Sequence, residues 1–159
     1  MDRQAFRTAL SDFVTGVAVV TARVDGVNYG VTINSFNSVS LEPPLVLFSL
    51  GRYLASLEAM TGATHVAINL FSRDQQHISR QFSRSTGAEK WQGVCYTEGA
   101  GGAPLLDGAL AQFQCRKHAV HDGGDHVICV VEVLDFARSD EALDPLVFFR
   151  SNYAQIAAT

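Results

Sequence analysis

Residues 14–34 carry the pattern that most restricts how this chain can fold. The first part, 14–24 (VTGVAVVTARV), is rich in β-branched residues, which favour strands. Asp25-Gly26 follows, a dipeptide typical of the tight turn between two antiparallel strands. Residues 27–34 (VNYGVTIN) then alternate between apolar and polar side chains, so that the apolar ones share one face. The segment therefore predicts a β-hairpin with one face in the core.

The rest of the chain adds more strands than helices. Asp2 is expected to cap the first helix, and Asp74 to lie near the start of the third. The segment 84–103 is rich in Gly, Ser and Ala, which predicts irregular surface chain. We expect further strands at 45–50, 65–71, 109–121, 126–137 and 145–149, and short helices at 3–12, 53–61 and 74–83.

Six or seven strands, many of them joined by hairpins, predict a mainly β fold. Because regular βαβ alternation is missing, we expect an antiparallel barrel with short flanking helices rather than a parallel sheet. No internal repeat and no linker divides the sequence, so residues 1–159 are expected to form a single domain.

The composition is that of a folded globular protein with a mild negative charge. Hydrophobic residues make up 47% of the chain and charged residues 18%, and the formal net charge is -4. The sequence contains no run of Lys or Arg. Nucleic acid and anionic membranes are therefore not expected as the main partners.

Cysteine usage and the first residues bear on the compartment. Cys95, Cys115 and Cys129 form no C-x-x-C pair, and their odd number favours free thiols in a reducing compartment. The opening MDRQAFRTALS lacks the apolar region of a signal peptide, and no stretch approaches the ~20 apolar residues of a membrane span. We therefore expect a soluble, cytoplasmic protein.

The segment 32–44 (TINSFNSVSLEPP) gathers many hydroxyl and amide side chains next to a predicted buried strand. Thr32 and Asn34 share one face, and Ser38 and Ser40 share it too if the chain stays extended. Such donors suit a phosphate or the polar edge of a heterocycle. Spacing alone favours a simpler interpretation, in which the Ser and Asn side chains bond to their own backbone in a turn.

A resemblance along the whole chain changes that balance. The opening FRTALSDFVTGVAVVTARVDGVNYGVTINSFNSVSLEPPLVLFSL resembles the start of the flavin reductase family, which has the FMN-binding split-barrel fold. Each later piece is weak alone, but the common order along nearly the entire sequence is specific. The later pieces are INLFSRDQQHISRQFS, APLLDGALAQFQC, GGDHVICVVEV and PLVFFRSNY.

The resemblance implies a flavin site formed by two consecutive segments. The residues that it places along the flavin are Thr32, Asn34, Ser35, Ser38, Val39 and Ser40. The segment after the third strand would supply phosphate contacts, namely Ser49, Arg52 and Ser56. A guanidinium fork such as that of Arg52 matches a phosphate with two hydrogen bonds.

Two further residues correspond to family positions near the nicotinamide. His126 would serve hydride transfer by orienting the ring or bonding its carboxamide. The simpler alternative is a His at a hairpin end, bonded to Asp125 or to solvent. Tyr153 would contact the nicotinamide or only anchor the tail against the barrel. Lys90-Trp91 resembles a basic–aromatic piece of the family, although no role is assigned to it here.

Other site types have little support. A metal site at His118, His121 and His126 is disfavoured because His-x-x-His on a strand directs its side chains to opposite faces. The segment 99–104 (GAGGAP) has Pro104 in place of the third glycine of a dinucleotide fingerprint. G-x-S-x-G motifs are missing, so acyl transfer is not expected.

The implied function is an NAD(P)H-dependent flavin reductase that supplies reduced flavin to a partner monooxygenase and works as a homodimer. FMN and FAD remain open, as do NADH and NADPH, although the lack of an Arg cluster for a 2′-phosphate favours NADH. The alternative is a flavin-binding electron carrier or storage protein that holds FMN tightly with little turnover.

Overall fold

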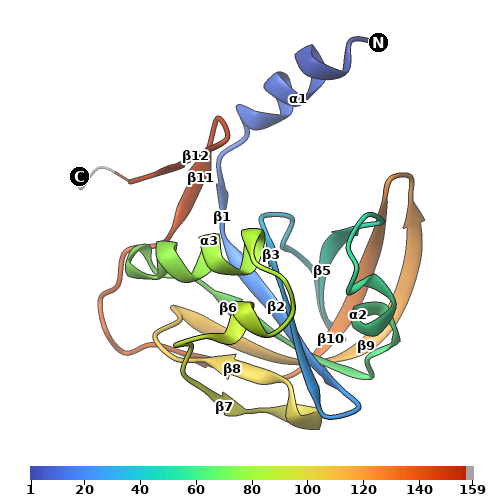
Figure 1. Ribbon diagram of the computed structural model, residues 1–159, viewed down its shortest axis with the longest axis vertical. Coiled ribbons are helices and arrows are strands. Elements are labelled where there is room, and N and C mark those ends of the chain that lie inside the picture. The colour runs from blue at the N-terminus through green and yellow to red at the C-terminus, as the bar shows by residue number, and fades with distance from the viewer. Residues whose placement is uncertain (157–159) are drawn as a thin grey trace.

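A seven-stranded antiparallel sheet is the centre of the molecule. The computed structural model describes residues 1–156 of the chain. The strand order is β3-β2-β6-β9-β10-β5-β4, and every neighbouring pair is antiparallel (Figure 1). The strands are β2 (Ala18–Val24), β3 (Val27–Ile33), β4 (Asn37–Leu41), β5 (Pro44–Gly51), β6 (His65–Leu70), β9 (Ala111–Gly123) and β10 (His126–Arg138). The expected mainly β, antiparallel fold is confirmed.

The predicted hairpin at the start of the chain is present. Strands β2 and β3 pair from Ala18↔Ile33 to Val24↔Val27. Asp25 and Gly26 both have positive φ angles, 50° and 78°, as a type I′ turn requires. Tyr29, Val31 and Ile33 of β3 then pack into the main hydrophobic core, which fills the barrel between the strands.

Two smaller sheets lie outside the barrel. Strands β1 (Thr15–Gly16), β11 (Val147–Phe149) and β12 (Asn152–Ala154) form one of them, and β7 (Tyr96–Glu98) and β8 (Pro104–Leu106) form the other. The sequence predicted one strand over 14–24, whereas the structure divides it into β1 and β2, which join different sheets. Strands β4, β7, β8 and β12 were not predicted as strands, and β7 lies within the segment 84–103 that was expected to be irregular.

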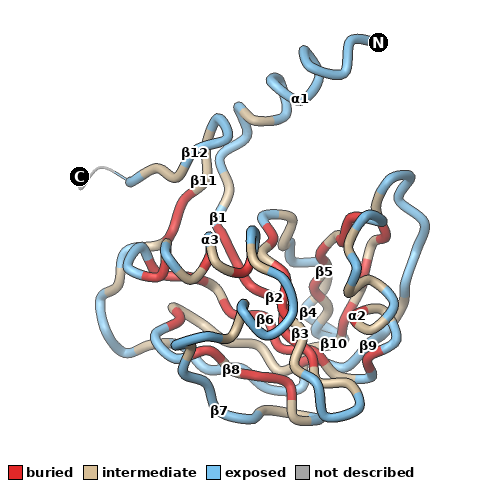
Figure 2. Tube along the Cα trace, viewed as in Figure 1, coloured by how far each residue is buried: buried red, intermediate tan, exposed pale blue. Residues whose placement is uncertain are grey.

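Helix α3 (Gln76–Arg84) covers the outer face of the β2–β3 hairpin (Figure 1). It follows a 3-10 turn, η1 (Arg73–Gln75), whose capping box is formed by Ser72 and Gln75. Phe82 of α3 lies in a second hydrophobic cluster on this outer face, together with Val17, Val19, Phe71, Leu106 and Leu146. Both faces of the hairpin are therefore covered (Figure 2).

The remaining short helices differ in how they pack. Helix α2 (Leu57–Gly62) is shorter than the predicted 53–61 and buries Met60, while the 3-10 turns η2 (Gly87–Trp91) and η3 (Ala100–Gly102) lie within the predicted irregular segment. Helix α1 (Arg3–Ser11) begins at the predicted cap, because the Asp2 carboxylate accepts hydrogen bonds from the backbone N–H groups of Gln4 and Ala5. No residue of α1 is buried, and the helix projects away from the barrel (Figures 1 and 2).

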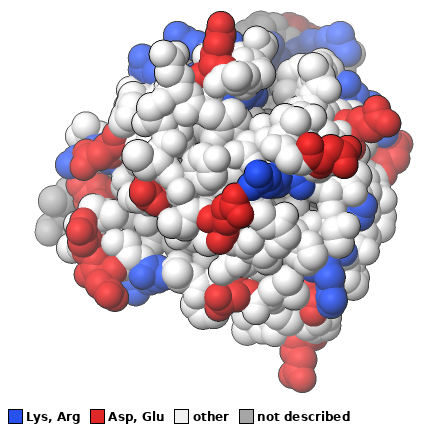
Figure 3. All heavy atoms as spheres, turned by 60° about the horizontal axis from the view of Figure 1, so that its bottom comes forward, with Lys and Arg blue, Asp and Glu red and all other residues white. Residues whose placement is uncertain are grey.

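On the face shown in Figure 3, acidic and basic side chains are interspersed, with acidic ones more numerous. Among residues 1–156, no helix has the length and apolar character needed to cross a membrane.

Candidate functional site

A groove of about 270 Å³ opens between the end of β3 and the end of β5. We call it the β3–β5 groove. Its lining brings together residues that are far apart in the sequence, because β3, β5 and the start of β10 meet at this end of the barrel. Five of the residues predicted for the flavin and nicotinamide sites line it: Thr32, Asn34, Ser35, Ser49 and His126.

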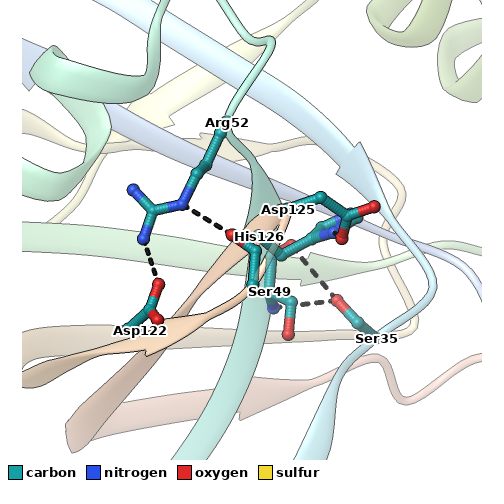
Figure 4. A network of polar contacts seen from close by, with 7 residues as sticks. Ser35, Ser49, Arg52, Asp122, Asp125 and His126 are labelled. Carbon is teal, nitrogen blue, oxygen red and sulfur yellow. Dashed lines mark hydrogen bonds and ion pairs between the residues drawn. The ribbon is translucent and has the colours of Figure 1, made fainter.

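Ser35 fastens the loop after β3 to strand β5. Its Oγ accepts a hydrogen bond from the backbone N–H of Ser49 at 2.9 Å and lies 3.3 Å from the Ser49 carbonyl oxygen, to which it donates (Figure 4). The hydroxyl therefore forms the hydrogen bonds with the Ser49 backbone that a neighbouring strand would otherwise form. This contact fixes the width of the groove at its polar end.

Thr32 connects the groove to the C-terminal part of the chain. Its Oγ1 donates to the carbonyl of Ser79 on α3 at 2.9 Å, and Ser79 Oγ is hydrogen-bonded to the Tyr153 hydroxyl at 2.7 Å. The Tyr153 ring packs edge-on against Phe148 and beneath the Arg80 guanidinium. Tyr153 therefore anchors β12 to α3 and does not itself line the β3–β5 groove.

The second half of the predicted flavin-lining segment lies on strand β4, at the edge of the sheet. A register shift separates Ser38 from Ser40, so the expected common face of these two residues is not kept. Ser40 Oγ accepts the backbone N–H of Glu42, which is the turn role that spacing alone favoured. Ser38 and Val39 are exposed, and none of these three residues lines the β3–β5 groove.

His126 begins β10 and is half-buried in the groove wall. Its Nδ1–H donates to the Asp125 carboxylate at 2.7 Å (Figure 4). This hydrogen bond, together with the charge of His126, lowers the pKa of Asp125. Because Nδ1 is occupied, Nε2 is the nitrogen through which His126 can meet a ligand. The simple structural role and the predicted functional one are therefore compatible.

Arg52 follows β5 but lies outside the groove lining. Its guanidinium forms an ion pair with Asp122 and donates from Nε to the Gly124 carbonyl at 2.8 Å (Figure 4). The predicted phosphate contact at Arg52 thus has a protein partner in this structure.

Lys90 is a groove residue to which the sequence analysis gave no role. It lies on η2, and its Nζ donates to the carbonyl of Gly30 on the edge strand β3 at 2.9 Å. Trp91 Nε1 donates in the same way to the Asn28 carbonyl at 3.1 Å. Burial lowers the pKa of Lys90. The Lys90-Trp91 dipeptide, already noted as a family-like piece, was the signal that could have located this cation.

A second groove, of about 410 Å³, shares Lys90 with the first. It lies between α2 and η2, and Ser56 lines it, so we call it the Ser56 groove. Ser56 therefore lines a different groove from Asn34 and Ser49, although Lys90 lines both. The structure brings it near the other predicted residues without placing it among them.

The β3–β5 groove fits a flat ring with one polar edge. Val31, Leu50 and Leu54 give apolar surface, as is usual in small-molecule sites. Among the described residues, the carboxamide of exposed Asn34 and the hydroxyl of half-buried Ser49 form no hydrogen bond with another residue. An isoalloxazine ring needs both kinds of surface, because its faces are apolar and its pyrimidine edge carries N–H and C=O groups.

Comparison with known proteins defines the class. A family model described as "Flavin reductase like domain" matches residues 10–157, and the chain belongs to this family. The surrounding fold is the split barrel of flavin reductases.

The individual relatives fall within the same class. The chain is 45% identical to "FMN reductase (NADH) SmoA" of Agrobacterium fabrum, over 91% of this chain and 81% of the relative. It is 37% identical to the reductase subunit HsaB of a flavin-dependent monooxygenase from Rhodococcus jostii, over 98% of this chain and 79% of the relative. The solved structure of the Streptomyces globisporus NADH:FAD oxidoreductase SgcE6 with NAD and FAD fragments has a TM-score of 0.91 and 34% identity, covering 98% of this chain and 93% of that one.

Proposed function

We propose that this protein is an NAD(P)H-dependent flavin reductase and that the β3–β5 groove is its flavin site. The observation that carries the proposal is the groove lining itself. Asn34, Ser49 and His126 line the groove together with several apolar residues. Family membership supports the same assignment.

Each wall of the groove has a separate task. Asn34 and Ser49 hydrogen-bond to the polar edge of the flavin, and the apolar residues cover its faces. His126, held through Nδ1 by Asp125, presents Nε2 to the nicotinamide. The two cofactors supply the hydride chemistry, so the protein has only to bring them together and exclude water. An acid–base triad is not needed.

FMN or FAD serves as the flavin and NADH as the preferred donor. SmoA is named an NADH-dependent FMN reductase and SgcE6 an NADH:FAD oxidoreductase, so both flavins occur among similar proteins. The reduced flavin passes to a separate flavin-dependent monooxygenase. This part of the proposal follows relatives such as HsaB, which is named as a reductase subunit of such an enzyme. A cytoplasmic location fits the free thiols of Cys95, Cys115 and Cys129.

The proposal includes a homodimer in which one protomer completes the site of its partner. Helix α1 carries an apolar face that the described chain leaves uncovered, with Phe6 and Leu10 exposed by 51% and 57%. At its end, Phe13 and Val14 line an apolar groove of about 570 Å³. Asn34 and Ser35 line this groove as well as the β3–β5 groove. A second copy seated there would lie beside the flavin.

Steady-state assays with NADH or NADPH and with FMN, FAD or riboflavin test the activity. Flavin-dependent oxidation of NADH is expected, and its absence with every pair would overturn the reductase assignment. Protein that is yellow as purified and turns over slowly would instead favour a carrier with tightly bound FMN.

Flavin titration tests the site. Replacing Asn34 with Leu (Asn34→Leu) should weaken flavin binding about tenfold, since a polar edge then loses its partner. Asn152→Leu is the matched control, because Asn152 is an exposed Asn that lines neither the β3–β5 groove nor the apolar groove at Phe13. Equal affinities for the two variants would remove Asn34 from the site.

A further inference from the structure

Arg52 makes three separate hydrogen bonds to one turn of the chain, the tip of the β9–β10 hairpin. Its backbone N–H donates to the Asp125 carbonyl at 2.9 Å, and its Nε donates to the Gly124 carbonyl at 2.8 Å. Its Nη2 pairs with the Asp122 carboxylate. Figure 4 shows the guanidinium turned toward this tip from the end of β5.

The same tip carries His126. Gly51, the residue before Arg52, is the register partner of His126 in the β5–β10 pair. Gly123 ends β9 and Gly124 begins the turn, and two consecutive glycines leave this part of the hairpin with little stiffness of its own. Sheet pairing with Gly51 and Gly123 fixes the His126 backbone, whereas the imidazole is hydrogen-bonded to Asp125, which lies in the turn. The contacts that hold the turn from outside the hairpin come from Arg52.

The geometry distinguishes contact with the hairpin tip from phosphate binding as the role of the Arg52 guanidinium. Gly51 and Tyr53, on either side of Arg52, line the β3–β5 groove, whereas the Arg52 side chain does not. Its guanidinium is committed at both Nε and Nη2, to a carbonyl and to a carboxylate. A phosphate would have to displace the Asp122 carboxylate before it could use the same fork.

We propose that Arg52 is a positioning residue: by fastening the hairpin tip it directs His126 into the groove, and so acts on nicotinamide use rather than on flavin affinity. The proposal rests on the proposed function, because it takes His126 as the nicotinamide contact. It assigns Arg52 a partner, Asp122, from which it is separated by 70 residues in the sequence.

Two substitutions distinguish a positioning role of Arg52 from a phosphate-binding role. Arg52→Ala and Asp122→Ala both break the ion pair, so under the proposal each raises the KM for NADH about three- to tenfold. The dissociation constants of FMN and riboflavin, measured by flavin fluorescence, should stay within about twofold of wild type. If Arg52 instead bound phosphate, Arg52→Ala would weaken the binding of FMN but not that of riboflavin. Asp122→Ala would then free the guanidinium and leave FMN binding equal or tighter.

Further variants show whether the effect passes through His126. His126→Ala should raise the KM for NADH, and adding Arg52→Ala to it should cause little further increase, because the two changes act on one contact. Arg52→Lys should remain impaired, since one ammonium cannot reach both the Gly124 carbonyl and Asp122, although it could still attract a phosphate.

A matched control lies elsewhere on the surface. Arg73 pairs with Asp144 at 2.9 Å and also donates its backbone N–H to the Asp144 carbonyl, and its side chain is 47% exposed, as is that of Arg52. Asp144→Ala should leave the KM values for NADH and flavin unchanged. A rise in the KM for NADH equal to that of Asp122→Ala would overturn the proposal.

Hydrogen exchange of the protein without cofactors gives a readout independent of activity. The backbone amides of 122–126 should exchange faster in Arg52→Ala and Asp122→Ala than in wild type or Asp144→Ala. The proposal is overturned if exchange at 122–126 is unchanged in these variants, or if they lose affinity for FMN but not for riboflavin. A wild-type protein that lacks flavin-dependent NADH oxidation defeats the proposed function instead, and the exchange result still measures whether Arg52 holds the tip.

Discussion

Ser35 and Ser49 touch each other, yet the contact occupies different atoms of the two residues. The Ser35 hydroxyl is fully used by the Ser49 backbone, whereas the Ser49 hydroxyl has no partner among the described residues. The first serine therefore belongs to the wall of the groove, and the second offers a group to the ligand. The same residue type at two positions of one site has two different physical roles.

This difference predicts opposite outcomes for two alanine variants. Ser35→Ala leaves the Ser49 N–H unpaired and should lower the free energy of unfolding by about 1–2 kcal/mol. Ser49→Ala should change that free energy by less than about 0.5 kcal/mol but weaken flavin binding severalfold. Urea denaturation and flavin titration of both variants measure the two effects. Equal stability losses would contradict the assignment of the two hydroxyls.

At the scale of elements, the packing of α3 on β3 depends on one glycine. A Cβ at Gly30 would collide with the ring of Phe82, so the helix can lie this close only because residue 30 has no side chain. The same contact also determines the distance between Thr32 on β3 and Ser79 on α3, which are joined by a hydrogen bond.

Gly30→Ala should therefore destabilise the protein by about 1–3 kcal/mol through overpacking. Gly62→Ala is the control, since a Cβ there would meet nothing within 4 Å and the backbone φ is not positive. Thermal unfolding of the two variants makes the comparison. A Gly30→Ala protein as stable as the control would show that α3 can shift at no cost, and flavin titration would then report whether Thr32 has moved with it.

The strands that the sequence predicted correctly are those with strong local signals. The Asp25-Gly26 turn and the alternation in 27–34 are both local properties, and the structure has the predicted hairpin, with Val24 paired to Val27 across the turn. The long pair β9 and β10 was also predicted as two strands, 109–121 and 126–137, and the structure pairs them as neighbours in the sheet.

The strands that were missed have no such signal. Strand β12 has three residues and follows a turn in which Arg150 and Ser151 adopt positive φ angles of 48° and 61°. Positive φ angles in turns are expected at Gly, Asn or Asp, so the Arg-Ser dipeptide does not predict this turn. Strand β4 lies at the sheet edge with a register shift, which hides the alternation of its residues.

The same limit applies to the candidate site. The family resemblance placed Thr32, Asn34 and Ser35 along the flavin, and the structure brings all three to one groove. The partners of Thr32 and Arg52 lie 47 and 70 residues away, and no local pattern indicates which distant group a side chain will meet. The sequence therefore indicated candidate residues for the site, whereas their individual contacts could be read only from the structure.

For the whole molecule, two buried thiols couple stability to pH. Cys115 and Cys129 lie in the barrel core on neighbouring strands. Burial raises the pKa of Cys115 to about 12 and that of Cys129 to about 11. In the unfolded chain both ionise near pH ~8.5. The folded state thus binds more protons than the unfolded state above this pH, so stability falls as pH rises from ~8.5 toward the folded values.

At pH 10 each of these two thiols should lower the free energy of unfolding by about 1–2 kcal/mol relative to its value at pH 7.5. The loss of unfolding free energy between these two pH values should therefore be smaller in Cys115→Ala than in wild type. Cys95→Ala is the control, because Cys95 is exposed. Urea denaturation at both pH values supplies the numbers, and an identical pH dependence in all three proteins would refute the coupling.

The proposed homodimer depends on helix α1, none of whose residues is buried by the described chain. Phe6 and Leu10 are one turn apart on the same face, and Phe13 continues that face with 77% exposure. An apolar helix face of this kind is not stable in water unless another surface buries it. Because Phe13 also lines the groove next to Asn34, the covering surface is expected to be that of a second copy.

The double variant Phe6→Ser/Leu10→Ser should therefore sediment as a monomer at concentrations where the wild type is a dimer, and it should bind flavin more weakly. The matched control is Gln4→Ala/Thr8→Ala, which changes the opposite face of the same helix and should leave the dimer intact. Analytical ultracentrifugation gives the mass, and flavin titration at the same concentrations gives the affinity. A wild-type protein that is monomeric throughout, or a monomeric variant with undiminished flavin affinity, would separate the flavin site from the partner subunit.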